Sequence, residues 1–228
     1  MRNCIILIIA AALMLALLVP ASHAAEIGFT DNFLMDKSDL YSTGSNPYFI
    51  LEPGYQLFFK SPDGDLTITV LNETKMVDGI ETRIVEERET EGGELVEVSR
   101  NYFAISKRNN SVFYFGEEVD MYENGKVTGH GGGWLAGVDG ARAGIAIPGI
   151  ALLGARYYQE VAPKVAMDRA EIVSVSDTRK VPAGEFKNVL KTEETTPLES
   201  GKEYKYYAPG VGLIKDSDME LVRFGNVK

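Results

Sequence analysis

The sequence predicts an all-β domain of mainly antiparallel strands, and two observations lead to this class. Segments that alternate apolar and polar residues recur along the chain, and dipeptides typical of tight turns separate them. Asp78-Gly79, Gly92-Gly93 and Asn124-Gly125 are of this kind, and each joins two strand-like segments. We therefore expect a meandering open or half-closed barrel of about a dozen strands, with one face packed and one face wet.

The predicted strands follow one another from Tyr55 onward. In the first half of the chain they are Tyr55–Lys60, Leu66–Leu71, Ile80–Thr90, Leu95–Ile105, Val112–Phe115, Glu118–Tyr122 and Lys126–Thr128. In the second half they are Arg156–Val161, Ala170–Asp177, Val189–Thr195, Glu203–Tyr207, Gly212–Lys215 and Met219–Phe224. Pro209-Gly210 fits a type II turn, because proline presets the first corner and glycine supplies positive φ at the second. Gly212 then permits a bulge, so we assign Pro209, Gly210 and Gly212 a structural role.

The first 24 residues have the layout of a secretory signal. Arg2 provides a positive start, Cys4 to Val19 is an unbroken apolar run of 16 residues, and Ser22-His23-Ala24 follows as a cleavage motif. The alternative is a membrane anchor, but the run is shorter than the roughly 20 residues that span a bilayer. We predict a periplasmic or secreted protein that is cleaved near Ala25 and has no stable membrane anchor afterwards.

The chain divides into three predicted parts. Residues 1–24 are the signal peptide, residues 25–45 form a flexible N-terminal segment, and residues 46–228 form a single β domain. Weak periodicity and many small or polar residues indicate the flexible part, within which Phe29 to Met35 is a short docked segment. Neither a linker nor an internal repeat of fixed period divides the β domain.

Composition excludes several kinds of chemistry. Without its leader the chain has no cysteine and a single histidine, His130, so disulfides, thiolate nucleophiles and Cys/His zinc sites are excluded. The formal net charge of −10 argues against binding to nucleic acid or to an anionic membrane surface. Calcium is the one metal that the remaining ligands suit, and no calcium-loop pattern occurs. We predict no metal site and no cofactor.

Two motifs invite a catalytic interpretation. The segment from His130 to Trp134, His-Gly-Gly-Gly-Trp, is similar to the oxyanion-hole segment of certain esterases, but the Gly-x-Ser-x-Gly elbow is missing and no second histidine remains. Carboxylates are numerous enough for acid–base work, as in glycoside cleavage. Because Glu117 and Glu118 point to opposite faces of a strand, a catalytic pair has to come from different strands. We predict no catalytic residue.

Residues 129–153 break the strand pattern and are rich in glycine, alanine and isoleucine. We expect a long glycine-rich loop over one side of the barrel, with a helical turn near Ala141 to Ile147 as an alternative. Trp134 is either a partly exposed lid residue or a core plug packed by Ile145 and Leu153. The residues that we predict to bind a ligand lie in or after this segment: Trp134, Asp139, Arg156, Tyr158 and His130.

Two stretches carry a resemblance to a known family. Val181–Phe186 reads Val-Pro-Ala-Gly-Glu-Phe, and Tyr207–Lys215 reads Tyr-Ala-Pro-Gly-Val-Gly-Leu-Ile-Lys. In this order and spacing they resemble an uncharacterised family of exported bacterial β-rich proteins, as do Trp134–Ala141 and Pro47–Gly54. The resemblance implies a barrel with a distant likeness in shape to periplasmic lipoprotein and lipid carriers. It implies no activity.

Three functions remain open after these exclusions. The first is a non-enzymatic binding or carrier module, whose partner is an unknown apolar small molecule, and it is favoured by the many aromatic residues and the glycine-rich segment. The second is a structural or interaction protein that holds an envelope protein. The third is an enzyme that acts on polysaccharide through carboxylates. A hollow barrel interior would favour the first, and a filled one the second.

Overall fold

The computed structural model describes residues 28–226, so the predicted signal peptide and cleavage site lie outside the described residues. The described residues contain one helix, the short 3₁₀ helix η1 (Lys37–Asp39). No helix among these residues is long and apolar enough to cross a membrane. The first nine strands are β1 (Leu40–Tyr41), β2 (Gly44–Asn46), β3 (Phe49–Leu51), β4 (Tyr55–Lys60), β5 (Gly64–Val77), β6 (Ile80–Glu91), β7 (Glu94–Ser106), β8 (Val112–Glu123) and β9 (Lys126–Gly129). The others are β10 (Trp134–Leu135), β11 (Arg142–Ile147), β12 (Arg156–Tyr158), β13 (Glu160–Val161), β14 (Arg169–Val181), β15 (Gly184–Thr195), β16 (Glu203–Ala208), β17 (Gly212–Asp216) and β18 (Met219–Asn226).

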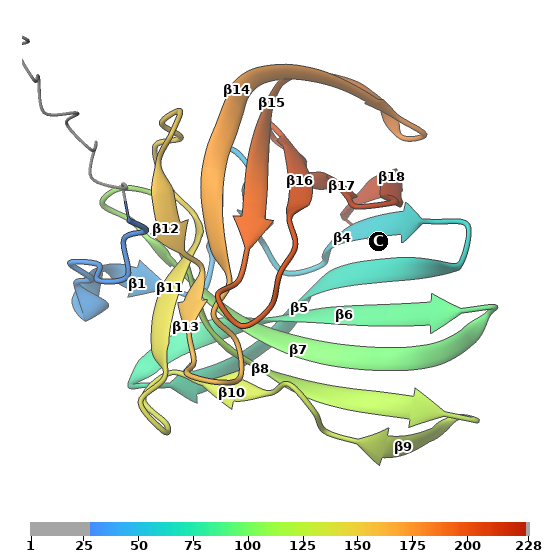
Figure 1. Cartoon of the computed structure of the whole chain (residues 1–228), viewed down its shortest axis with the longest axis horizontal. Coiled ribbons are helices and arrows are strands. Elements are labelled where there is room, and N and C mark those ends of the chain that lie inside the picture. Colours follow the sequence, from blue (N-terminus) through green and yellow to red (C-terminus); the bar gives the residue numbers. More distant parts are fainter. Residues whose placement is uncertain (1–27, 227–228) are drawn as a thin grey trace, which may run out of the picture.

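The strands form an all-β, antiparallel, nearly closed barrel, as the sequence predicts. Its 13 strands pair in the order β12-β14-β15-β16-β17-β18-β4-β5-β6-β7-β8-β11-β13, and one seam stays unsealed. Hairpins join β4 to β8 and β14 to β18 in sequence order, and the pairing of β18 with β4 connects the two halves. In Figure 1, β4 to β8 run across the view while β14 and β15 run nearly perpendicular to them, so the sheet wraps around an interior.

The hairpin turns have the backbone conformations that their sequences predict. Asp78 and Gly79 have φ values of 48° and 77°, and Asn124 and Gly125 have φ values of 51° and 74°. Two successive residues with positive φ are the mark of a type I′ turn, whose twist matches that of the flanking strands. Gly210 has a φ of 74°, as the type II turn between β16 and β17 requires.

The glycine-rich segment forms part of the barrel wall as well as loops. β10 and β11 both pair with β8, so the residues for which a helical turn was the alternative are a strand. β8 also joins the predicted strands Val112–Phe115 and Glu118–Tyr122 into one. The remaining residues of the segment connect these strands along one side of the barrel.

The seam lies where one strand changes its partner. β12 pairs with β14 and β13 pairs with β11, and Gln159 alone separates β12 from β13. The predicted continuous strand Arg156–Val161 therefore carries the chain across the seam at Gln159. β11 approaches this point closely, since a Cβ atom at Gly144 would lie 2.4 Å from the carbonyl oxygen of Gln159. A side chain at Gly144 would force the two backbones apart, so glycine is required there.

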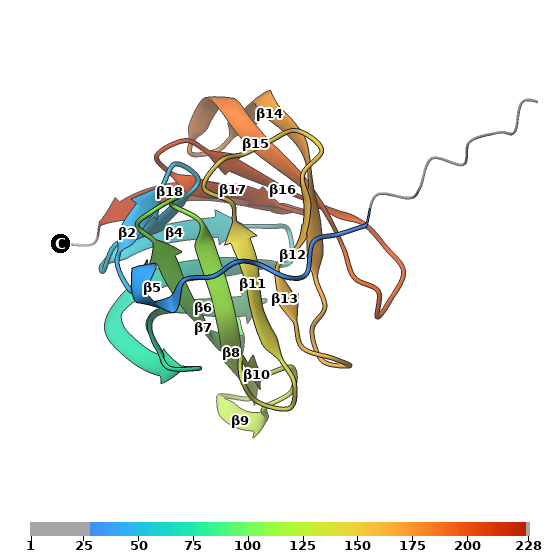
Figure 2. The same ribbon diagram turned by 90° about the vertical axis from the view of Figure 1, so that its left-hand side faces the viewer.

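Residues that follow Gly28 lie along the outside of this seam. In Figure 2 the N-terminal segment crosses β8 and β11 and reaches β12. Thr30 donates its N–H to the carbonyl of Arg156 at 3.0 Å and accepts the N–H of Tyr158 at 2.8 Å. The ring of Phe33 meets that of Phe113 edge-on, at 6.3 Å between centroids. This packing places the predicted docked segment, Phe29 to Met35, against the barrel.

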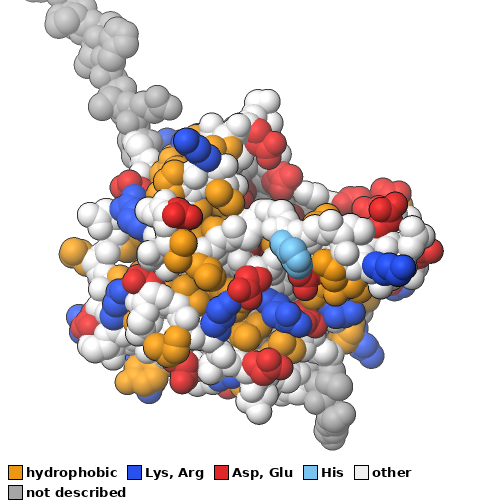
Figure 3. All heavy atoms as spheres, turned by 90° about the horizontal axis from the view of Figure 1, so that it is seen from below, with side chains coloured by type: hydrophobic (Ala, Val, Ile, Leu, Met, Phe, Trp, Pro, Cys, Tyr) orange, Lys and Arg blue, Asp and Glu red, His pale blue; other side chains and the backbone are white. Residues whose placement is uncertain are grey.

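The buried apolar side chains of the described residues form four clusters rather than one continuous core. Tyr102, Phe59 and Phe115 are the largest of the fully buried side chains; Tyr102 and Phe115 lie in one cluster, and Phe59 lies in another. On the face that Figure 3 shows, acidic and basic side chains are interspersed with hydrophobic ones. Charges of both signs therefore occur on this outer face.

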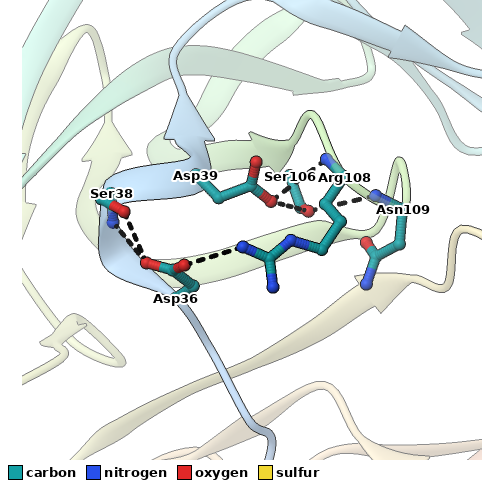
Figure 4. Close-up of polar contacts among 6 residues, drawn as sticks. All are labelled: Asp36, Ser38, Asp39, Ser106, Arg108 and Asn109. Carbon is teal, nitrogen blue, oxygen red and sulfur yellow. Dashed lines mark hydrogen bonds and ion pairs between the residues drawn. The ribbon is translucent and has the colours of Figure 1, made fainter.

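The helix η1 is fixed to the turn between β7 and β8 by polar contacts (Figure 4). Asp39 accepts hydrogen bonds from the Ser106 hydroxyl at 2.5 Å and from the backbone N–H of Arg108 at 3.1 Å. Asp36 caps η1 through Ser38 and forms an ion pair with Arg108 at 2.9 Å. These contacts hold the N-terminal segment at one end while Thr30 holds it at the other.

Candidate functional site

Residues of the barrel interior line a partly open cavity of about 300 Å³, at the lower end of the size range of small-molecule sites. One part of its wall is apolar and aromatic, and includes Phe49, Leu57, Ile68, Val70, Val85 and Phe103. The other part carries charge, from the acidic residues Glu87, Glu117, Glu160, Asp168, Glu194 and Asp216 and from Lys205. The interior is therefore hollow and amphipathic.

Strand alternation explains why charged residues face the interior. Successive side chains on a strand point to opposite faces, so a residue two positions from an inward apolar residue also points inward. Val85 and Glu87 are related in this way on β6, and Lys205 and Tyr207 on β16. On β8, Glu117 lines the cavity, whereas its neighbour Glu118 forms an ion pair with Lys75. The predicted opposite orientation of these two glutamates agrees with these contacts.

Lys205 is the one cation among the residues that line the cavity. Its Nζ lies 3.1 Å from a carboxylate oxygen of Glu194 and 3.5 Å from one of Asp216. The charge of Glu194 and then that of Asp216 raise the pKa of Lys205 well above its ordinary value, so this lysine stays protonated. Burial raises the pKa of Asp216 despite the opposing charge of Lys205. Lys205 therefore forms ion pairs with two carboxylates, those of Glu194 and Asp216.

The other four acidic residues of the cavity take part in no ion pair of the described chain. Glu160 is 3% exposed, and one of its carboxyl oxygens accepts the backbone N–H of Asp168 at 2.7 Å. Burial, followed by the charge of Asp168, raises the pKa of Glu160 from 4.5 to about 8. Burial likewise raises the pKa of Glu87 to about 7, and it raises the pKa values of Glu117 and Asp168.

Two residues of the cavity wall have buried polar atoms without a hydrogen-bond partner in the described structure. These atoms are Nε1 of Trp134 and Oε1 of Gln159. The other end of the Gln159 amide donates to Glu194 at 3.4 Å, which identifies the free end as the oxygen. Buried polar groups of folded proteins usually have partners, and an atom without one calls for an explanation. A molecule in the cavity would supply one.

Three of the five predicted ligand-binding residues come together at a second hollow, which shares Trp134 with this cavity. Trp134, Asp139 and His130 line this hollow of about 510 Å³, and Nδ1 of His130 lies 2.7 Å from a carboxylate oxygen of Asp120. Trp134 and Glu117 line both hollows, so they form part of the wall between them.

The other two predicted residues, Arg156 and Tyr158, lie apart from both hollows. Arg156 pairs with Glu171 at 2.8 Å, and the ring of Tyr158 meets that of Phe29 at 6.2 Å between centroids. Both side chains are therefore engaged with neighbours on β14 or in the N-terminal segment.

Trp134 is a core residue, as the second of the two interpretations of the sequence expects. It is 6% exposed, packs in the same cluster as Ile145, and meets the Tyr114 ring edge-on at 5.2 Å between centroids. The lid interpretation, which requires a partly exposed Trp134, is wrong. Leu153 is 69% exposed, so it does not pack against Trp134 as expected.

The acidic wall of the cavity is the feature that the sequence predictions missed, apart from Glu117 as a carboxylate candidate. Its members come from β6, β8, β13, β15 and β17 and from the loop before β14, so they are far apart in the sequence. The sequence did offer one signal for these residues: a glutamate or lysine two positions from an inward-facing apolar residue on the same strand. Among residues 28–226, no group of three or more His, Cys, Asp or Glu side chains is arranged to hold a metal ion.

Comparison of the chain with models of protein families, with curated proteins and with solved structures finds no match. The functional argument therefore depends on the geometry and chemistry of the barrel interior.

Proposed function

We propose that this chain is an exported, non-enzymatic binding or carrier protein that holds one small molecule inside its barrel. The hollow interior supports this proposal most directly, because a protein that served only as an envelope scaffold would have no need of a cavity of about 300 Å³. The secretory layout of the first 24 residues supports action in the periplasm or outside the cell. The resemblance to exported β-rich proteins, with their distant likeness to lipid carriers, points the same way.

The apolar wall supports a ligand with a substantial hydrophobic part. The rings of Phe49 and Phe103 pack against each other at a tilt, with centroids 5.0 Å apart, and Ile68 and Val70 of β5 also line the cavity. Burial of apolar surface contributes about 25 cal/mol per Å², so a short alkyl or aromatic group gains several kcal/mol in such a site.

Binding of a neutral apolar fluorophore tests this function. N-phenyl-1-naphthylamine, whose emission rises in apolar surroundings, should bind the mature protein saturably at one site per chain. Ala146 lines the cavity, so Ala146→Leu should reduce this affinity by filling space. Val127→Leu is the matched control, because Val127 is 45% exposed on β9, outside the cavity. Absence of saturable binding, or equal affinity in Ala146→Leu, would refute the proposal.

One observation favours a second function, the cleavage of polysaccharide. A carboxyl group that stays protonated near neutral pH, as Glu160 does, can act as a general acid. Incubation of the protein with cell-wall and plant polysaccharides, followed by an assay for new reducing ends, tests this alternative. Product formation that Glu160→Gln abolishes would support it, and no product with any substrate would count against it.

A further inference from the structure

We propose that the molecule held in the barrel is an amphipathic amine, with its cationic nitrogen at the acidic wall and its apolar part against the aromatic wall. This inference rests on the proposed function, since it names the class of ligand that the same cavity takes. It departs from a purely apolar or lipidic ligand, which the sequence alone favours.

The balance of charge in the cavity is the first argument. Six carboxyl groups face one ammonium group, and that ammonium lies between Glu194 and Asp216. Glu87, Glu117, Glu160 and Asp168 have no cation within ion-pair distance in the part of the chain that the structure describes. Buried charge without a partner is costly, and paired buried charge is far less so. A ligand cation would supply the missing partner.

The unpartnered atoms of the wall are a second, independent argument. Oε1 of Gln159 is a buried acceptor without a donor, and an ammonium N–H would satisfy it. Trp134 at the cavity wall is only 6% exposed, and its buried Nε1 is a donor without an acceptor in the described structure. A hydroxyl or carbonyl oxygen on the ligand would accept from it. The rings of Trp134 and Tyr114 also suit a cation, because aromatic faces attract positive charge.

Proton linkage follows from the same arrangement. The groups that act on Glu87 and Glu160 are Glu97, Glu117, Asp168, Asp216 and Lys205, and burial of the two carboxyls is the largest effect. The raised pKa values of Glu87 and Glu160 keep both carboxyls partly protonated near neutral pH in the empty cavity. A bound cation favours their ionised forms, so binding should release protons and the affinity should rise with pH between about pH 6 and pH 9.

Three ligands with the same chain and different head groups provide the test. Octylamine, 1-octanol and octanoate are titrated at pH 8 by calorimetry and by the fluorescence of Trp134, the single tryptophan. We expect octylamine to bind at least about 10-fold more tightly than octanol, a difference in affinity that one charge-assisted hydrogen bond accounts for. Octanoate should bind most weakly of the three, because its carboxylate would face the acidic wall. Equal affinity of octylamine and octanol would overturn the amine assignment and leave the carrier function intact. Failure of all three ligands, and of N-phenyl-1-naphthylamine, would overturn both.

Matched variants locate the cation within the cavity. Glu87→Gln and Glu117→Gln should each weaken octylamine binding about 10-fold and leave octanol binding unchanged. Glu118→Gln is the control, because Glu118 neighbours Glu117 in sequence but pairs with Lys75 instead of lining the cavity. Melting temperatures establish that each variant folds. Octylamine affinities unchanged in both cavity variants, or equally reduced in Glu118→Gln, would contradict the proposal.

Discussion

Replacement of Glu160 by glutamine should stabilise the protein at high pH and have little effect at low pH. Glu160 is buried on β13, and burial raises its pKa from 4.5 to about 8. The folded state therefore binds this proton more tightly than the unfolded state does. The resulting contribution favours folding below the unfolded pKa and is lost as the pH rises through the folded pKa.

The size of the effect follows from the pKa shift. One pKa unit corresponds to about 1.36 kcal/mol, so the shift of Glu160 places an upper limit on the order of 5 kcal/mol on the lost stability. Glu87 adds to this slope, because burial raises its pKa to about 7. The unmodified protein should thus be more stable near pH 5.5 than near pH 9. Glutamine keeps an oxygen that can accept the backbone N–H of Asp168, so Glu160→Gln should remove much of this slope.

Urea unfolding at several pH values between about 5.5 and 9 measures the effect. Near pH 9, Glu160→Gln should exceed the unmodified protein in free energy of unfolding by roughly 2–4 kcal/mol, and near pH 5.5, about one unit above the unfolded pKa, the difference should fall to about 1 kcal/mol. Glu118→Gln is the control, since hydrogen bonds from Lys75 and Tyr102 lower the pKa of Glu118. It should not flatten the pH dependence. A flat profile of the unmodified protein, or a Glu160→Gln profile parallel to it, would refute the reasoning.

Four further predictions concern the fold and the leader. Gly144→Ala should cost roughly 2–4 kcal/mol in urea unfolding, because its Cβ would lie 2.4 Å from the carbonyl oxygen of Gln159, and unchanged stability would show that the seam can open there. Gly210→Val should cost on the order of 1–3 kcal/mol through its φ of 74° alone, since nothing lies within 4 Å of the added Cβ, and an unchanged melting temperature would contradict the assigned turn. Trp134→Ala should cost about 3–5 kcal/mol as a large-to-small core change, whereas a loss below about 1 kcal/mol would show that Trp134 is not a plug. N-terminal sequencing of exported protein should begin near Ala25, and a sequence that starts at Met1 would disprove cleavage.

Local signals in the sequence account for most of the fold. The strands that follow Asp78-Gly79 and Asn124-Gly125 match the prediction to within one residue, because both dipeptides suit turns with two positive φ values. The strands that precede these turns, β5 and β8, extend further than predicted, to Val77 and back to Val112. The closure of the barrel was not predictable in this way. The pairing of β18 with β4 joins segments separated by most of the chain, and the change of partner at Gln159 leaves no mark in an otherwise regular strand.

The candidate site was predicted less well, for a physical reason. Strand alternation predicts that Glu117 and Glu118 face opposite ways, but it does not say which of them faces the interior. A lone tryptophan beside three glycines fits a mobile loop as well as a core plug, and only the packing of Trp134 against Tyr114 decides between them. Lys205 and Glu194 belong to different strands, so their meeting in the cavity depends on register and closure together.

Native mass spectrometry of the mature protein, purified from cells that produce it naturally, tests the central claim most directly. The account predicts a complex of one chain with one small molecule, which dissociates when the protein is unfolded and which contains a basic nitrogen. Ala146→Leu, with its partly filled cavity, should carry less of this molecule than the Val127→Leu control. A bare chain mass in gentle conditions, the same for the unmodified protein and for both variants, would contradict the claim that the barrel holds a ligand.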